Sequence, residues 1–404
     1  MLIICPTANR GGCLMRIIGL IVLATIIAGA GFWAFVRNQT VDLSDLDPYS
    51  GRGGSPSDLD PFLESVRDRT SLPAIAASIL SPETVIAAGE TGLADANARL
   101  PLPEGGAWHI GSLTKNMTAI LAARLVEEDL IDWDTTPAEI WPDWPADFNT
   151  DWRDVPLHRF LRMNAGVQRH EGSAAVVDRW AQSADRSAEP RRQRAEFVEA
   201  ALSLPPATEP GTQFHYANDS YIIAAHMMEI RTGTAYEQLM STYLFEPLGL
   251  ATAGFGPPSD ILGHRANGEV VPTAPDADNP AVISPAGRVH LSTADYTRYL
   301  QFLLRASRGE SEWVSENSMD VLFQPFDGEG EAYAMGWTVR DDLGPNFPIF
   351  THTGSNTYWY AEVWLIPDRD LAVFVFTNQG DTGSVTDAVA WRLVTAELER
   401  SMAN

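Results

Sequence analysis

The chain has 404 residues, of which 45% are hydrophobic, so it is long enough and apolar enough to bury a large core. Its formal net charge of -25 at pH 7 argues against nucleic acid or an anionic membrane surface as the main partner, because both would repel such a surface. These values exclude a disordered chain and a nucleic-acid-binding protein.

An apolar segment lies near the N-terminus. Residues 17–36, "IIGLIVLATIIAGAGFWAFV", carry no charge and are long enough to span a bilayer as a helix. More arginines precede this segment than follow it, so we expect residues 1–16 in the cytoplasm and the main domain on the extracytoplasmic side, periplasmic or extracellular. We expect an uncleaved transmembrane anchor. Cleavage as a signal segment, which would give a secreted protein, is the alternative.

The residues before this segment limit the chemistry of the rest. Both cysteines, Cys5 and Cys13, lie there, so the remainder has no disulfide, no cysteine nucleophile and no thiolate metal site. The eight histidines show no HExxH or comparable spacing, and we expect neither a metal site nor a cofactor. Met15 is an alternative start to Met1.

The next elements predict a tether followed by a helix and a hairpin. Residues 37–60 are rich in Gly, Pro, Ser and Asp and are expected to form a flexible linker, so that the folded domain covers residues 61–404. Residues 61–69 have helical spacing. Residues 74–80 and 84–92 are predicted strands joined by the turn "SPE".

The C-terminal end repeats this arrangement. Residues 357–381 predict two strands joined by the turn "PDRD", and residues 384–401 have helical spacing. Antiparallel strands pair through tight turns, so we expect an α+β fold in which both chain ends build one antiparallel sheet flanked by the terminal helices. The middle, residues 95–341, is expected to be a mainly helical subdomain with long loops.

Two segments of the middle resist assignment, residues 166–197 and 256–287. Loops of this length in a compact domain are usually functional or mobile. The first contains Arg191, Arg192 and Arg194. We interpret these arginines as a solvated helix start, and a substrate-binding role is the alternative.

Lys115 is the only lysine of the chain, and Ser112 lies three residues before it. An amine can lose its proton when it is buried, whereas a guanidinium cannot, so a lysine can act as a base where arginine cannot. Apolar residues recur every fourth position after Ser112, which predicts a helix with both side chains on one face. Ser112 alone is typical of a helix cap, but a helix N-terminus also suits a nucleophile and an oxyanion.

Two further motifs follow in the chain, Tyr216-Ala217-Asn218 and His352-Thr353-Gly354. Taken singly, Tyr216 is typical of a core aromatic and Asn218 of a turn residue. Together with Ser112-x-x-Lys115, however, they stand in the order Ser-x-x-Lys, Tyr-x-Asn and Lys/His-Thr-Gly. In this order, and in segments such as "LPAIAASIL" and "SPAGRVHLSTADYTRYLQFLL", the chain resembles the serine hydrolases related to class C β-lactamases and penicillin-binding D,D-peptidases.

The resemblance implies a β-lactamase/transpeptidase-like fold and a role for each motif. Ser112 is the expected acylated nucleophile, and Lys115 and Tyr216 are expected to share the proton transfers. Asn218 is expected to position Lys115 or the substrate amide. The substrate is expected to contact His352, Thr353 and Gly354, and the backbone N–H groups of Ser112 and Ser355 to form the oxyanion hole.

The chain also departs from that family at two places. His352 stands where β-lactamases carry lysine, so a permanent positive charge is replaced by a histidine expected to titrate near neutrality. In "RFLRMNAGV", Asn164 and Ala165 replace a stretch that usually resembles His-Thr-Ser-Gly. This puts the loop packing beneath the site in doubt.

These observations predict a membrane-anchored, exported serine hydrolase that acts through an acyl-enzyme. Its expected substrate is a small ester, a D-amino-acid peptide or a lactam, with an esterase or a D,D-carboxypeptidase-like peptidase ranked above an efficient β-lactamase. The alternative is a catalytically silent relative that binds cell-wall peptide or regulates a partner. That alternative predicts the loss of a motif residue, and none is lost.

Overall fold

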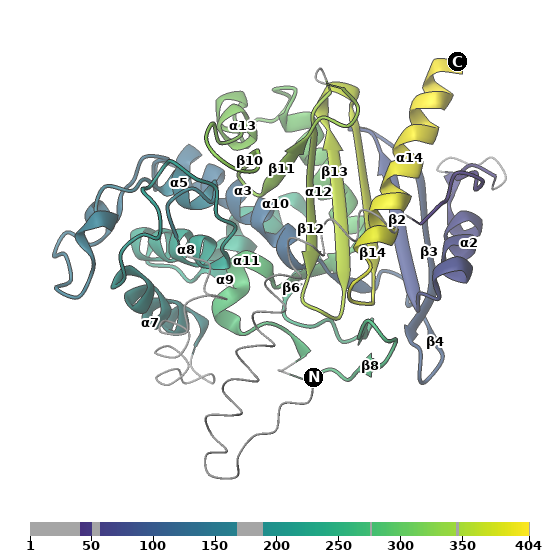
Figure 1. The fold of residues 1–404 in the computed structure, drawn as a ribbon, viewed down its shortest axis with the longest axis horizontal. Helices are drawn as coiled ribbons and strands as arrows, with labels where there is room; N and C mark the ends of the chain where they lie inside the picture. The colour runs from purple at the N-terminus through teal and green to yellow at the C-terminus, as the bar shows by residue number, and fades with distance from the viewer. Residues whose placement is uncertain (1–40, 51–56, 168–188, 275–276, 345–346, 404) are drawn as a thin grey trace, which may run out of the picture.

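The computed structural model describes residues 41–50, 57–167, 189–274, 277–344 and 347–403. These residues form an α+β fold in which helices cover both faces of one large sheet and a mainly helical part lies beside it (Figure 1).

Nine strands of the described residues form the main sheet: β1 (Ser57–Asp58), β2 (Ala74–Leu80), β3 (Val85–Asp95), β4 (Leu100–Pro101), β10 (Tyr333–Ala334), β11 (Trp337–Arg340), β12 (Ile349–Ser355), β13 (Tyr360–Ile366) and β14 (Leu371–Thr377). Their order is β1-β3-β2-β14-β13-β12-β11-β10, and β4 pairs with β3. The N-terminal hairpin joins the C-terminal strands through antiparallel pairing of β2 with β14. The predicted sheet built from both chain ends is therefore confirmed.

The helices of the described residues are α2 (Asp60–Thr70), α3 (Thr114–Glu127), α4 (Pro137–Ile140), α5 (Leu157–Leu161), α7 (Pro190–Leu202), α8 (Asn218–Thr232), α9 (Tyr236–Met240), α10 (Glu246–Leu248), α11 (Ser284–Gly287), α12 (Thr293–Ala306), α13 (Glu316–Phe323) and α14 (Gly383–Ala403). In Figure 1, α2 and α14 cover one side of the sheet, and α3 and α12 lie behind it. Helices α5, α7, α8 and α9 form the part beside the sheet (Figure 1). The predicted terminal helices are confirmed as α2 and α14.

Helices on both faces explain the apolar runs in the central strands. Strands β2 and β14 are buried along their whole length, and successive residues of a strand point to opposite faces. Ile75 and Val375 therefore belong to the core shared with α2 and α14, whereas Ala76 and Phe376 belong to the core shared with α3 and α12. Such strands read as continuous apolar runs rather than as alternating patterns.

Short strands in the middle of the chain were not predicted. One three-stranded sheet contains β5 (Ala107–His109), β9 (Val289–Ser292) and β6 (Gly254–Phe255), and β7 (Gly263–His264) pairs with β8 (Val270–Val271). Strands of two to four residues are too short to show a period in the sequence. The first of these sheets matters for the site because β5 leads directly toward Ser112.

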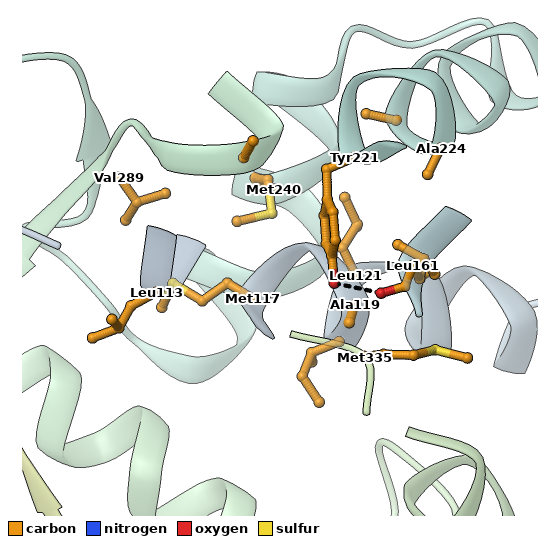
Figure 2. Close-up of a cluster of buried hydrophobic side chains, with 14 of the residues drawn as sticks. Leu113, Met117, Ala119, Leu121, Leu161, Tyr221, Ala224, Met240, Val289 and Met335 are labelled. Atoms are coloured by element: carbon orange, nitrogen blue, oxygen red, sulfur yellow. Dashed lines mark hydrogen bonds between the residues drawn. The ribbon is translucent and has the colours of Figure 1, made fainter. Parts of the chain in front are cut away.

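Helix α3 lies at the centre of the core, and eleven of its fourteen residues are buried. The sequence predicted one apolar face, but the sheet and the helical part enclose the helix from different sides. Figure 2 shows Met117 and Leu121 of α3 among side chains from other elements, with Tyr221 of α8 donating a 2.9 Å hydrogen bond to the carbonyl of Leu161. This enclosure fixes the position of the helix that carries Lys115.

The predicted flexible linker, residues 37–60, does not hold over residues 41–50, which pack against the domain. Leu43 is buried, and the hydroxyl of Tyr49 donates a 2.7 Å hydrogen bond to Glu397 of α14. The Gly, Pro, Ser and Asp composition correctly predicts an absence of regular structure here, but a few apolar anchors suffice to hold an irregular segment in place.

The predicted anchor, residues 17–36, and the predicted cytoplasmic residues 1–16 lie outside the described part of the chain. Within the described ranges, no helix is both long enough and apolar enough to cross a membrane.

Arg194 is neither a solvated residue nor a substrate-binding one. Its side chain is fully buried and forms ion pairs with Glu229 at 2.6 Å and Glu237 at 2.7 Å. Burial alone would raise the pKa of Glu229, but hydrogen bonds from His226 and Arg194 lower it to about 2. The arginine therefore compensates a buried carboxylate inside the helical part.

Replacing Arg194 with methionine is expected to lower the free energy of unfolding by about 3–5 kcal/mol, because Glu229 would stay buried without its cation. Arg192→Met is the matched control, since Arg192 is exposed and its pair with Glu196 should contribute about 1 kcal/mol or less. Urea denaturation at pH 7 measures both variants. Equal losses would contradict the structural role given to Arg194.

Candidate active site

The chain reaches Ser112 through a tight turn between β5 and α3. The turn η1 (Gly111–Leu113) begins with Gly111 at a φ of +51°, which glycine adopts without strain. A Cβ atom on Gly111 would stand 2.3 Å from the backbone nitrogen of Ser355. Glycine therefore lets this turn lie directly against β12.

The interpretation of Ser112 as a helix cap is wrong. Leu113 occupies the cap position of α3, and no side chain bonds to the helix end there. Instead, the Oγ atom of Ser112 lies 2.9 Å from the Nζ atom of Lys115. The structure thus brings the two side chains of the first motif into hydrogen-bond contact.

Lys115 is fully buried and has three oxygen partners. Its Nζ atom lies 2.9 Å from Ser112 Oγ, 2.8 Å from Asn218 Oδ1 and 2.6 Å from the carbonyl oxygen of Ala286. Burial lowers the pKa of Lys115 well below 10.5. Once the amine is neutral, its two N–H groups serve the two carbonyl oxygens and its lone pair is left for the proton of the Ser112 hydroxyl. The surroundings therefore suit Lys115 as the acceptor of the Ser112 proton.

The second motif meets the first at the start of α8. Asn218 is the first residue of this helix, and Tyr216 lies two residues before it. The Nζ atom of Lys115 is 4.9 Å from the centre of the Tyr216 ring. Both predicted residues of the motif thus lie beside the lysine, Asn218 through a hydrogen bond and Tyr216 through its ring.

The unusual segment "RFLRMNAGV" supports this motif. The backbone N–H of His215 donates a 2.8 Å hydrogen bond to the carbonyl of Met163, and the N–H of Ala217 contacts the sulfur of the same residue at 3.1 Å. Asn164 and Ala165 are both buried. The departure from the family pattern therefore still gives a packed loop beneath the site.

The third motif lies inside β12, a strand that was not predicted and that precedes the predicted C-terminal hairpin. Strand β11 pairs with β12 only as far as Thr351, and Gly354 and Ser355 lie against the turn η1. A Cβ atom on Gly354 would stand 2.0 Å from the carbonyl oxygen of Ile110 and 2.8 Å from the nitrogen of Ser112. Glycine thus brings the backbone nitrogens of Ser112 and Ser355 to adjacent positions, as an oxyanion hole requires.

His352 is held in a neutral state, contrary to the prediction that it titrates near neutrality. It is buried, and burial is the main cause that lowers its pKa to about 3; Lys115 would lower it further whenever that amine is protonated. Its Nδ1 atom lies 2.6 Å from the carbonyl oxygen of Thr353, so Nδ1 carries the ring proton and donates a hydrogen bond to that oxygen. The Nε2 atom is then the acceptor for the hydroxyl of Tyr333 at 3.2 Å.

The lowered pKa of His352 predicts a dependence of stability on pH. Between pH 3 and 6.5 the unfolded chain binds a proton here and the folded chain does not, so this contribution is present above pH 6.5 and is lost as the pH falls toward 3. The loss of unfolding free energy between pH 7 and pH 4 is expected to be smaller by about 3 kcal/mol in His352→Gln than in the natural chain. Urea titrations at both pH values measure it, and identical losses would contradict the assignment.

Sequence reasoning missed two groups of this site. The carbonyl of Ala286, in α11, accepts a hydrogen bond from Lys115, and Tyr333 contacts both His352 and the ring of Tyr216. Every residue has a backbone carbonyl, so the sequence cannot mark this one as a site group. The segment "SPAG" was noted only because it resembles the family. In the described ranges, no group of three or more His, Cys, Asp or Glu side chains is arranged to hold a metal ion.

Comparison with known proteins shows the family of the chain. Residues 59–397 match the protein family described as Beta-lactamase. The chain belongs to this family of serine hydrolases. The octameric penicillin-binding protein homologue from Pyrococcus abyssi has a similar fold, with a TM-score of 0.64 and 22% identity over 82% of this chain and 76% of that one.

Curated relatives of differing function are similar to the chain at low identity. An unguisins hydrolase of Aspergillus violaceofuscus is 24% identical over 78% of this chain, and the match spans only 59% of that protein. Penicillin-binding protein 4 of Amycolatopsis lactamdurans is 22% identical over 67% of this chain and 71% of its own length. Lovastatin esterase of Penicillium rubens is 23% identical over 60% of this chain and 65% of its own length.

Proposed function

We propose that the chain is an esterase that forms an acyl-enzyme on Ser112. Lys115 accepts the proton of Ser112 while Oγ attacks the carbonyl carbon, and the N–H groups of Ser112 and Ser355 stabilise the negative oxygen. Tyr216 relays the proton that Lys115 took from Ser112 to the leaving group, so Lys115 is neutral again. A water molecule then gives a proton to the same groups and attacks the acyl carbonyl, and the bond to Ser112 Oγ breaks as Oγ takes that proton back.

The observation that carries this proposal is the set of partners around Lys115. A buried amine with a lowered pKa, two carbonyl acceptors and one hydroxyl has the properties of a base poised against a nucleophile. Catalytic silence, the alternative class, gives no reason to keep a costly buried lysine beside a serine. The similarity to an esterase and to an unguisins hydrolase also supports hydrolysis.

The neutral state of His352 supports esters over the other substrates. D-amino-acid peptides and β-lactam drugs both present a carboxylate, and a hydrogen bond to a charged group contributes about 1.5–3 kcal/mol. Without a cation at His352, such substrates lose that contribution, a factor of about 10–150 in kcat/KM. D,D-carboxypeptidase activity is the second candidate because of the similarity to penicillin-binding proteins, and efficient β-lactam hydrolysis is ranked last.

We also propose that the domain works outside the cytoplasm, anchored by residues 17–36. The apolar run and the excess of arginines before it support this placement. Protease added to intact cells that make the full chain should then digest the domain and spare residues 1–16. Complete protection of the domain would argue against export.

The experiment for the activity uses the full chain and Ser112→Ala. A fluorophosphonate should add its mass to a peptide containing Ser112 in the natural chain, and the variant should stay unlabelled. Two p-nitrophenyl esters with the same acyl chain, one ending in a carboxylate, are then compared with nitrocefin and a D-Ala-D-Ala peptide. Preference for the neutral ester supports the proposal. Absence of both labelling and turnover in a folded protein would refute it.

A further inference from the structure

A second buried polar cluster lies directly behind the oxyanion hole. It contains His109 of β5, Asp278 and Asn356, which come from three distant segments of the chain. His109 is 1% exposed, Asn356 is 5% exposed, and the side chain of Asp278 is not exposed at all. Burying a carboxylate costs stability unless it has partners, so this cluster needs a physical explanation.

His109 connects this cluster to the turn that carries the nucleophile. The backbone N–H of Gly111 donates a 3.1 Å hydrogen bond to the Nδ1 atom of His109. Because Nδ1 accepts, the ring proton resides on Nε2, which lies 3.0 Å from Asp278 Oδ1. The hydrogen bond from Gly111 therefore sets the tautomer of His109, Asp278 lies in ion-pair contact with its Nε2 side, and the histidine holds the peptide group between Ile110 and Gly111.

Asn356 connects the same carboxylate to β12. Its Nδ2 atom donates a 3.0 Å hydrogen bond to Asp278 Oδ1. Its Oδ1 atom accepts hydrogen bonds from the backbone N–H groups of Tyr358 and Trp359 at 3.2 and 3.3 Å, which fixes the orientation of the amide. Asn356 directly follows Ser355, so this contact holds the chain next to the second donor of the oxyanion hole.

The Oδ1 atom of Asp278 thus contacts both His109 and Asn356, which lie on the two sides of the proposed oxyanion hole. The other carboxylate oxygen is held by Arg288 Nε at 3.2 Å. Desolvation alone would raise the pKa of Asp278, but its contacts with His109, Asn356 and Arg288 lower it and compensate for the burial of the carboxylate. Displacing a catalytic donor by about 1 Å lowers the rate about 100-fold, so a rigid link between the two donors has kinetic value.

We propose that Asp278, acting through His109 and Asn356, sets the spacing between the backbone N–H groups of Ser112 and Ser355. The three residues are positioning residues, since none contacts the reacting atoms. The inference rests on the proposed function insofar as it requires acyl transfer at Ser112.

The test uses the full chain with Asp278→Asn and Asn356→Ala, and a neutral p-nitrophenyl ester as substrate. Both variants are expected to lower kcat about 100-fold with little change in KM, because the donors act on the transition state. A boronic acid that adds to Ser112 places an oxygen in the same hole. Its Ki should rise in proportion to the loss of kcat/KM.

Thr386→Val is the control for a purely structural effect. Thr386 is fully buried and bonds to Glu362 on the α14 side of the sheet, so its replacement should lower Tm and leave kcat and the boronate Ki unchanged. His109→Asn adds a second check. The asparagine side chain can still accept the hydrogen bond from the Gly111 N–H, but it is too short to contact Asp278. The kcat of this variant should therefore also fall.

Each outcome decides the proposal. A lower Tm with unchanged kcat and boronate Ki in both main variants would overturn it. If Asp278→Asn does not fold, Asn356→Ala alone decides by the same two readouts. Failure of the natural chain to react with boronate or ester would reject the proposed function itself, which separates that failure from this one.

Discussion

Replacing Lys115 with arginine is expected to lower the rate of Ser112 acylation about 1,000-fold or more. The guanidinium keeps its proton in the site, so it cannot accept the proton of the serine hydroxyl. General-base catalysis and its coupling to the nucleophile account for a loss of this size. Fluorophosphonate labelling rates and ester turnover measure it.

Lys115→Met separates the loss of the base from a loss of folding. Methionine fills a similar volume without a polar head, and burying the amine costs stability in the natural chain. This variant is therefore expected to be inactive while its Tm stays equal or rises. Arg124→Met, on the same helix but bonded to Trp313 and Glu128, should keep the acylation rate. Substantial acylation in Lys115→Arg would contradict the role of base.

Gly354→Ala is expected to lower kcat about 100- to 1,000-fold with a smaller effect on KM. The added methyl would meet the carbonyl oxygen of Ile110 at 2.0 Å and the nitrogen of Ser112 at 2.8 Å, both backbone atoms. The strand and the turn must then separate, which removes one donor from the proposed oxyanion hole. Steady-state kinetics with a neutral ester measure the two constants separately.

Gly287→Ala is the matched control for that substitution. A methyl at Gly287 would meet the backbone of Gly111 at 3.6 Å, an ordinary van der Waals distance in the same neighbourhood. Its kcat should stay close to that of the natural chain. Equal activity of Gly354→Ala and the natural chain would contradict the placement of the oxyanion hole.

The outer elements of the fold could be predicted because they depend on local patterns. The local sequence determines hairpins with tight turns and helices with apolar spacing. The predicted ones are present as β2–β3, β13–β14, α2 and α14. Residues 41–50 and the short strands β5, β6 and β9 could not, because long-range contacts rather than local periodicity hold them. Arg194 shows the same limit, since its two carboxylate partners lie 35 and 43 positions away.

The candidate site shows which features of an active site a sequence motif can predict. Spacing and order predicted Ser112, Lys115, Tyr216 and Asn218 correctly as neighbours. The protonation state of His352 was predicted wrongly because burial, which is a property of the fold, lowers its pKa. Backbone groups such as the carbonyl of Ala286 leave no trace in residue type at all.

The titration of Lys115 tests the central claim, that a neutral amine beside Ser112 is the base, most directly. Because the chain has one lysine, lysine labelled with ¹³C at Cε gives a single NMR signal whose shift follows its protonation. The natural chain should show a pKa well below 10.5, and Ser112→Ala should keep it low, since burial is its cause. A pKa at or above 10.5 in the folded natural chain would contradict the account.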